Sequence, residues 1–303
     1  MKIQLLSAMA VAALVFSSCS KDKIKEDIKD ESIQFSGKIT NLKATAGNLS
    51  AVSSWAANDA IGVFMLEQGT QVISENAMNR KYVSNGTTFL AEAGQEIYYP
   101  VSPIPVDFIS YAPFKTGTSI SSPLAIDLTN QSNQAAIDLL WAKSNNAGVG
   151  FLKTSGISVP LTFDHKLSKI IIKPTASAGL SSTDPSWASM VVGINNLNSK
   201  ASFDLYTGLV SNPTNVVTIN PKSTVAGQTY EAIVLPSNNP TAGAFTFTFL
   251  INGATYTYRS AINEHFEAGK EYTYNLSITK TGVHLGSVTV TDWVTVSRSG
   301  IAN

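Results

Sequence analysis

The sequence predicts an all-β protein built from β-sandwiches. From Ser32 onward, apolar and polar residues alternate with a period of two, which is the pattern of half-buried strands. Stretches rich in Gly, Pro, Asn and Ser separate these segments, and many short strands with turns between them are typical of sandwiches. In this part of the chain the one candidate helix is short, Ala135–Lys143. Apolar residues make up 44% of the 303 residues, which is enough for a packed core.

The chain begins with the pattern of an export signal, residues 1–18. Met1-Lys2 is a basic start, and the mostly apolar stretch Ile3–Phe16 follows. This stretch is too short to cross a bilayer as a helix, which takes about 20 residues, but it has the length of the apolar core of a signal peptide. Two serines end the segment, and their small side chains admit a signal peptidase.

Cys19 is the single cysteine of the chain and directly follows this segment. Its surroundings resemble a bacterial lipobox, although Phe16 stands where that pattern usually has leucine. The resemblance implies that Cys19 becomes the lipidated first residue of the mature protein; the alternative is ordinary secretion without a lipid. Two or more acyl chains give stable membrane attachment. A single cysteine also excludes an intrachain disulfide and a zinc site built from cysteines.

Residues 19–31 are expected to form a charged tether. Nine of the eleven residues from Lys21 to Glu31 are charged, whereas charged residues make up 14% of the whole chain. Two isoleucines cannot bury such a segment, so we expect it to stay solvated and to hold the folded part off the membrane. A short helix is the alternative, because Ile24 and Ile28 are four residues apart.

The clearest hairpin covers residues 245–258. Asn252-Gly253 is a preferred pair for a type I′ turn, in which both central residues need a positive φ. A two-residue loop at this place puts Phe247 opposite Tyr258, with aromatic side chains on one face of the hairpin and threonines on the other. Turn chemistry and hydrophobic pattern therefore predict the same register.

The domain boundary is predicted near the middle of the chain. Residues 145–156 are rich in Asn, Gly and Ser and poor in apolar residues. We therefore divide the folded part into an N-terminal sandwich, residues 32–157, and a C-terminal sandwich, residues 158–303. Each half is large enough to bury roughly 65–70% of the surface of its unfolded chain.

Several short motifs follow one another in order along the chain. They are Trp55–Phe64 (WAANDAIGVF), Tyr98-Tyr99-Pro100 with Phe108–Pro113 (FISYAP), Asp127–Leu140 with Asn130-Gln131-Ser132 and Asp138-Leu139-Leu140, Leu161–Lys169 (LTFDHKLSK), Phe266–Tyr274 (FEAGKEYTY) and Val290–Trp293 (VTDW). Each alone is a weak signal, but their order, after a lipobox, resembles the Bacteroidales fimbrillin family.

The resemblance implies a fold and a role. Fimbrillins are lipoprotein precursors with two tandem transthyretin-like β-sandwich domains, and they reach the outer membrane as stalk, anchor or tip subunits of type V fimbriae. In stalk subunits a protease removes the first strand of the N-terminal domain, and a strand from another subunit fills the groove. For this chain the resemblance implies a structural or adhesive fimbrial subunit at the cell surface. Its expected partners are other fimbrial subunits in a homo- or heteropolymer, the outer membrane through the lipid on Cys19, and a host or bacterial surface ligand.

The valine-rich segment Gly286–Ser297 is the candidate donor strand. Its apolar side chains recur at every second residue, with an irregularity expected at Asp292, and it carries little charge. A donated strand pairs the free backbone groups of a sandwich that lacks one strand, which is β-augmentation. The alternative is an ordinary last strand that completes its own domain. The side chains expected to enter the groove are those of Val288, Val290, Val294 and Val296.

One departure from the family concerns processing. The best-known stalk subunits are cut after an arginine near the first strand. Here the first arginine is Arg80, and residues 33–55 offer only Lys38 and Lys43. Either another protease acts, or the subunit stays uncut and lipid-anchored, or the chain is an accessory protein.

The sequence indicates a structural or binding protein and not an enzyme. Metalloprotease, serine-hydrolase and P-loop motifs are absent from it, and we expect neither a cofactor nor a metal site. The 21 basic and 21 acidic residues cancel, which argues against nucleic-acid binding. His165, next to Asp164, is expected to be a structural, hydrogen-bonded histidine. The alternative function is a surface lipoprotein that binds glycans for nutrient capture, and tryptophans gathered in one exposed cleft would favour it.

Cys19→Ala is expected to abolish labelling of the protein by a tagged fatty acid in the producing cell, because the thiol that accepts the lipid is lost. Phe16→Leu, which restores the usual lipobox residue, serves as the control and is expected to keep the label. Labelling that persists in Cys19→Ala would contradict the lipid anchor.

Overall fold

The computed structural model describes residues 31–40, 55–239 and 241–293. The elements belong to one compact unit, Ser32–Asn303. In the described ranges they are nineteen strands, the four-residue helix α1 (Pro185–Ala188) and the 3-10 turns η1 (Gln134–Ala136), η2 (Asn146–Gly148) and η3 (Lys153–Ser155). The predicted all-β class is therefore confirmed. None of these helical segments has the length and apolar character needed to span a membrane.

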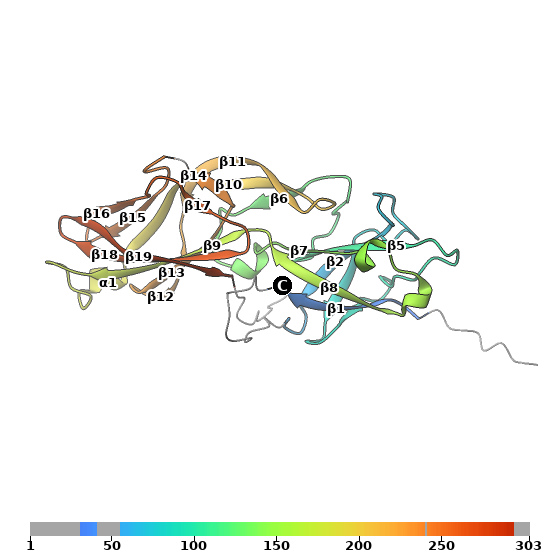
Figure 1. Cartoon of the computed structure of the whole chain (residues 1–303). Helices are drawn as coiled ribbons and strands as arrows, with labels where there is room; N and C mark the ends of the chain where they lie inside the picture. Colours follow the sequence, from blue (N-terminus) through green and yellow to red (C-terminus); the bar gives the residue numbers. More distant parts are fainter. Residues whose placement is uncertain (1–30, 41–54, 240, 294–303) are drawn as a thin grey trace, which may run out of the picture. The chain divides into compact units, whose positions relative to one another are not determined.

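The first half of the chain forms a closed barrel. Its strands are hydrogen-bonded in the order β1-β4-β3-β2-β5-β7-β8, and β8 returns to β1. Figure 1 shows β1 beside β8. All neighbours are antiparallel except β1 and β8, which run parallel along the whole of β1. The barrel strands are β1 (Gln34–Ile39), β2 (Ala60–Glu67), β3 (Arg80–Ser84), β4 (Phe89–Ala91), β5 (Val106–Ala112), β7 (Leu140–Ser144) and β8 (Ser158–His165).

Strands β2 and β5 are buried on both faces. The side chains of Ile61, Val63 and Met65 from β2 enter the barrel core, whereas Phe64 and Leu66 pack into a second apolar cluster on the other face. Every residue of β5 is buried. Burial on both faces explains why β2 is a nearly continuous apolar run and not an alternating one.

The second half forms a sandwich of two sheets and a small ribbon. One sheet has the order β11-β10-β15-β16, with β6 on β10, and the other has the order β12-β13-β9-β18-β19. Ile194 and Phe247 from the first sheet share one core with Ile172 and Tyr274 from the second. The strands are β6 (Leu124–Asp127), β9 (Ser168–Ala176), β10 (Val191–Asp204), β11 (Leu209–Ile219), β12 (Lys222–Val225), β13 (Thr229–Val234), β15 (Thr246–Ile251), β16 (Ala254–Arg259), β18 (Lys270–Thr279) and β19 (Gly282–Asp292), with β14 (Ser237–Asn239) and β17 (Glu264–Phe266) in the ribbon.

The chain passes from barrel to sandwich after His165. Strand β8 pairs with β1 and β7, so the boundary predicted at residue 157 lies too early. Residues 145–156, read from their composition as a linker, instead connect two strands of the same barrel. Strand β6 precedes that boundary but pairs with β10 of the sandwich. A third apolar cluster also joins the two parts, with Ile109 from β5 and Phe203 from β10 among its members.

The hairpin predicted at residues 245–258 is confirmed. Strands β15 and β16 pair Phe247 with Tyr258, and their rings stack with centroids 5.5 Å apart. Asn252 and Gly253 have φ angles of 47° and 76°, as a type I′ turn requires.

The short helix predicted at Ala135–Lys143 is wrong. The turn η1 covers only Gln134–Ala136, and the chain then extends into β7, which pairs with both β5 and β8. Pairing with a strand on each side outweighs the weak local helix preference of so short a segment.

Candidate functional site

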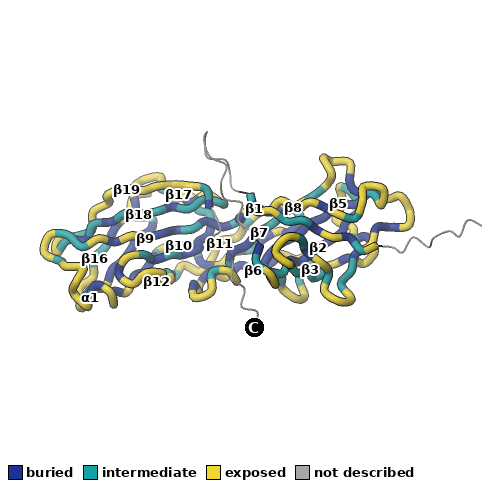
Figure 2. The backbone as a smooth tube through the Cα atoms, turned by 90° about the horizontal axis from the view of Figure 1, so that it is seen from below, coloured by how far each residue is buried: buried dark blue, intermediate teal, exposed yellow. Residues whose placement is uncertain are grey.

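The terminal strand β19 lies at the edge of its sheet. In the described part of the chain its ladder partner is β18, and β19 ends the strand order of that sheet. The residues from His284 to Thr291 are all exposed, unlike those of the inner strand β9 (Figure 2). An edge of this kind presents unpaired N–H and C=O groups with which another strand can pair.

Two of the predicted donor valines lie on the core side of β19. Val288 is paired with Tyr274 and Val290 with Tyr272, and residues directly opposite each other share a face of the sheet. Both tyrosines are buried, but Val288 is 37% and Val290 52% exposed. The apolar row of β19 therefore faces the core side without being fully covered.

The irregularity expected at Asp292 occurs at Gly286 instead. The register of β19 against β18 shifts between the pairs made by Ser287 and Leu285, which leaves Gly286 as the extra residue. Asp292 stays in the ladder opposite Lys270, and its carboxylate lies 2.7 Å from the Lys270 ammonium.

The other predicted site residues, Cys19, Val294 and Val296, lie outside the described residues, as does Lys43. Lipid attachment and strand donation therefore stay predictions. In the described ranges β19 is paired within its own sheet, which is the position of a last strand that completes its own domain.

Trp293 anchors the end of β19. Its side chain is 4% exposed and stacks on His165, with ring centroids 4.2 Å apart and an interplanar angle of 12°. Its backbone N–H donates to the carbonyl of Gly269 over 2.8 Å. The ring stack ties the strand end to barrel strand β8, on which His165 is the last residue, and the hydrogen bond ties it to the residue directly before β18.

The buried His165 is hydrogen-bonded, as expected, but its partner is not the neighbouring aspartate. His165 Nδ1 lies 2.8 Å from the carboxylate of Asp138, and both side chains are almost fully buried. Asp164 instead accepts a hydrogen bond from the hydroxyl of Thr40 over 2.5 Å. The pair Asp138–His165 orients the ring on which Trp293 stacks, so its geometry explains a structural role.

In contrast to β19, the first strand, β1, has fully buried apolar side chains and pairs with a strand on each side. It pairs with β8 along its whole length and with β4 at Phe35. Ile33, Phe35 and Ile39 are at most 4% exposed. Loss of β1 would uncover an apolar groove and an unpaired edge of β8, which are the two features that a donated strand satisfies.

Among the described residues, no arginine lies at a place where cleavage would release β1. Lys38 is exposed but lies within β1 itself. Arg80 is the first residue of β3, and its guanidinium donates to the carbonyl of Asn76 over 3.0 Å. A cut at Arg80 would sever the barrel sheet instead of releasing its first strand.

The four tryptophans, all within the described ranges, do not form an exposed platform. Trp55, Trp187 and Trp293 are buried, at 6%, 4% and 4% exposure. Trp141 is half-buried, and its indole N–H donates to the carbonyl of Leu205 over 2.7 Å. The arrangement that would favour glycan binding is therefore not met. The described residues also hold no group of three or more His, Cys, Asp or Glu placed to bind a metal ion.

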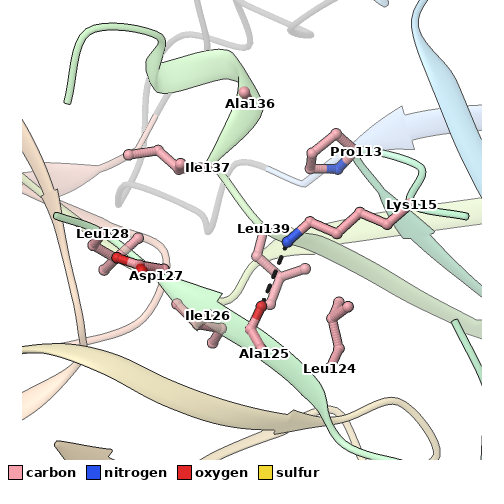
Figure 3. Close-up of a pocket in the computed structure, with 10 residues that line it drawn as sticks. All are labelled: Pro113, Lys115, Leu124, Ala125, Ile126, Asp127, Leu128, Ala136, Ile137 and Leu139. Atoms are coloured by element: carbon pink, nitrogen blue, oxygen red, sulfur yellow. Dashed lines mark hydrogen bonds between the residues drawn. The ribbon is translucent and has the colours of Figure 1, made fainter. Parts of the chain in front are cut away.

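A small cavity of about 30 Å³ lies beside β6 (Figure 3). Leu124, Ile126 and Ile137 line it, and the Lys115 ammonium donates to the carbonyl of Ala125 over 3.4 Å. Burial lowers the pKa of Lys115. A volume of this size holds about one water molecule, so it is a packing gap and not a ligand site.

A larger cleft, of about 470 Å³, lies at the turn between β15 and β16. Asp184, Trp187 and Tyr256 are among its lining residues. The Trp187 indole N–H donates to the carbonyl of Gly227, and Asp184 accepts from the backbone N–H and the hydroxyl of Ser186. Both the Trp187 indole and the Asp184 carboxylate in this cleft therefore already have hydrogen-bond partners within the chain.

Comparison with known proteins shows the family. A family model described as "Fimbrillin-like" matches residues 43–293. The chain is also 31% identical to the "Putative fimbrium subunit Fim1C" of Bacteroides uniformis, over 99% of this chain and 98% of that protein. The chain therefore belongs to the fimbrillin-like family, as its motifs predicted.

Solved structures share the fold. A crystal structure of a "putative cell adhesion protein" from Bacteroides uniformis is 30% identical, with a TM-score of 0.70 over 88% of this chain and 99% of that one. Another, from Bacteroides ovatus, is 23% identical, with a TM-score of 0.66 over 88% and 98%. The tip fimbrial protein Mfa3 of Porphyromonas gingivalis, solved with a C-terminal truncation, has a TM-score of 0.53 at 9% identity, over 87% of this chain and all of that one. Family and fold together support the predicted role of a fimbrial subunit at the cell surface.

Trp293→Ala is expected to loosen the end of β19, because the buried ring on His165 and its packing are lost. Hydrogen–deuterium exchange of a peptide covering β19 is expected to rise at least tenfold at residues 289–292. Thr291→Ala, at an exposed position of the same strand, is the control and is expected to leave exchange near its original rate. Unchanged protection in Trp293→Ala would contradict the anchoring role.

Proposed function

We propose that this chain is a fimbrial subunit that joins its neighbours by strand donation, with β19 and the residues after it as the donated segment. The observation that carries the proposal is the row of apolar side chains on the core side of β19 that stays exposed in the single chain. Val288 and Val290 are free to gain burial in a neighbour. Full burial of a fully exposed valine stabilises by about 1.5–3 kcal/mol, and these two half-buried side chains can gain only part of that.

The acceptor in this proposal is the groove of β1. Phe35 and its neighbours on β1 occupy an apolar groove that closes the barrel. A strand from a second subunit at this place would pair with the edge of β8 and bury its own apolar row. A head-to-tail contact between different surfaces of identical chains extends into a filament and does not close on itself.

The lipid and the location belong to the same proposal. A lipid on Cys19, followed by the charged tether, would hold the subunit at the outer membrane with its folded part at the cell surface. The partners are other fimbrial subunits, and an adhesive role adds a surface ligand of a host or bacterium. In this proposal the protein assembles fimbriae and does not catalyse a reaction. The barrel provides the acceptor groove, and the sandwich provides the donor strand.

The two valines and the two threonines that alternate with them, Thr289 and Thr291, provide a matched test. Val288→Asp with Val290→Asp is expected to leave the single chain folded, because both side chains are partly exposed, but to lower incorporation into fimbriae at least tenfold, because a carboxylate in an apolar groove is strongly unfavourable. Immunogold labelling of isolated fimbriae measures incorporation, and circular dichroism of the purified chain measures folding.

The control is Thr289→Asp with Thr291→Asp. It adds the same charge and the same loss of strand preference at exposed positions on the opposite face of β19. It is expected to keep near-normal incorporation. Equal incorporation by both double variants would sink the donor role of β19.

A further inference from the structure

The groove under β1 has one deep pocket at Phe35. Its ring is fully buried and meets Tyr82 edge-on, with centroids 4.9 Å apart, and Phe108 at 5.3 Å. Two hydrogen bonds fix Tyr82: its hydroxyl donates to the carbonyl of Ile33 over 3.1 Å and accepts from the N–H of Ile97 over 3.0 Å. Burial raises the pKa of that hydroxyl, so it stays a neutral donor. The pocket is therefore lined for an apolar side chain. The bond to Ile97 stays when β1 leaves, whereas the bond to Ile33 leaves with it and must be replaced by a carbonyl of the strand that fills the groove.

Two residues further along the strand, at Gly37, the groove is already full. A Cβ atom there would lie 2.6 Å from Cε2 of Phe89 and 3.0 Å from Nε1 of Trp55. Gly37 does not have a left-handed φ, so the requirement for glycine is one of space and not of backbone conformation.

The side chains that fill this position hold one another in place. The Trp55 ring meets Phe89 and Phe163 edge-on, with centroids 4.9 Å and 5.0 Å apart. All three are buried. Because a packed aromatic cluster has little room to yield, a larger residue at Gly37 costs either displacement of these rings or a shift of the strand.

The pocket at Phe35 and the filled position at Gly37 together allow only one register of a strand in the groove against β8. A slip by one residue turns the apolar side chains of the strand away from the core. A slip by two residues keeps them on the core side but places the side chain of Phe35 or of Ile39 where Gly37 now fits. Any strand that replaces β1 meets the same restriction.

The terminal strand carries a matching pattern when it is read in reverse. Gly286 is followed at two-residue intervals by Val288 and Val290. Placed at Gly37, Gly286 would bring Val288 to the Phe35 pocket and Val290 to the position of Ile33. The reverse reading also brings His284 to the position of Ile39, at the end of β1. Read in the direction of β1, the same alignment puts His284 into the deep Phe35 pocket and Gly282 at the position of Ile33, so one valine and not two is buried, and the polar ring takes the central position.

We propose that the β1 groove accepts β19 of a second copy of this chain in a single register, with Gly286 at the position of Gly37 and the strand antiparallel to β8. The inference rests on the proposed strand donation and adds its register, its direction and the residue that sets them. Gly286 thereby acts as the specificity-determining residue of the donor strand, and Gly37 marks the matching place in the acceptor.

Peptide exchange into the full-length chain tests this. A protease site is introduced between residues 41 and 54 and cut, so that β1 is held only by its noncovalent contacts. Biotinylated peptides are then added: residues 32–40, residues 282–292, and the second peptide with Gly286→Val or with Ser287→Val. The use of peptides matters, because in the chain itself a Cβ at Gly286 lies 3.2 Å from the carbonyl oxygen of Asn275 and would strain its own sheet.

We expect capture of the 32–40 and 282–292 peptides, at least tenfold weaker capture with Gly286→Val, and capture within about threefold of the original with Ser287→Val. A photo-cross-linker at the C-terminal end of the 282–292 peptide is expected to label β8 near Ser158, whereas a label near Phe163 would refute the direction.

The outcomes separate the two proposals. Equal capture of the Gly286→Val and unsubstituted peptides would overturn the glycine register and leave strand donation standing. Capture of the 32–40 peptide without the 282–292 peptide would overturn donation by β19 of a second copy. Failure of the 32–40 peptide to exchange would overturn both, because β1 would then not be a replaceable strand.

Discussion

The parallel ladder between β1 and β8 is the interaction on which the proposed assembly by strand donation depends. The other neighbouring strands of the barrel are antiparallel, whereas β1 meets β8 in parallel along its whole length and touches β4 at a single pair. Parallel neighbours cannot be joined by a tight hairpin turn. Once the chain between β1 and β2 is cut, β1 is retained only by its lateral hydrogen bonds and its buried side chains, and as the first strand it can be exchanged while the rest of the barrel order stays intact.

The first and last strands of the described part are complementary, because β1 fills an apolar groove and β19 carries apolar side chains that are not fully buried. The apolar side chains of β1 are fully buried, and the barrel core is incomplete without them. The apolar side chains of β19 are half-exposed, and the outer edge of this strand ends its sheet. Trp293 limits how far β19 can move, since its ring is held on His165, which Asp138 holds in turn. If β19 is donated as proposed, its release must break this stack, and the contact then sets a free-energy cost for the start of assembly.

Features set by residues close together in the sequence could be predicted, whereas features set by contacts between distant residues could not. The hairpin at residues 245–258 was predictable in register, because a turn pair and an alternating pattern act locally and agree. The boundary at residue 157 was not, since the alternation of β8 gives its buried face but not the sheet to which it belongs. The segment at 135–143 was too short for helix preference to outweigh pairing with β5 and β8.

The site itself was partly predictable. The valines of β19 follow from their spacing, and the exposure of Val288 and Val290 was the additional fact that the fold supplied. The filled position at Gly37 could not be seen, because a strand glycine with an ordinary φ looks like any other until Phe89 and Trp55 are placed beside it. The stack of Trp293 on His165 joins residues far apart in sequence and carries no local signal.

The most direct measurement is a cryo-electron microscopy reconstruction of fimbriae that contain the full chain, at a resolution that shows side chains. Strand donation predicts that residues 286–292 of one subunit lie beside β8 of the next, antiparallel to it, with Gly286 against Phe89 and Trp55. A reconstruction in which every β19 remains paired with its own β18, and every β1 with its own β8, would contradict it.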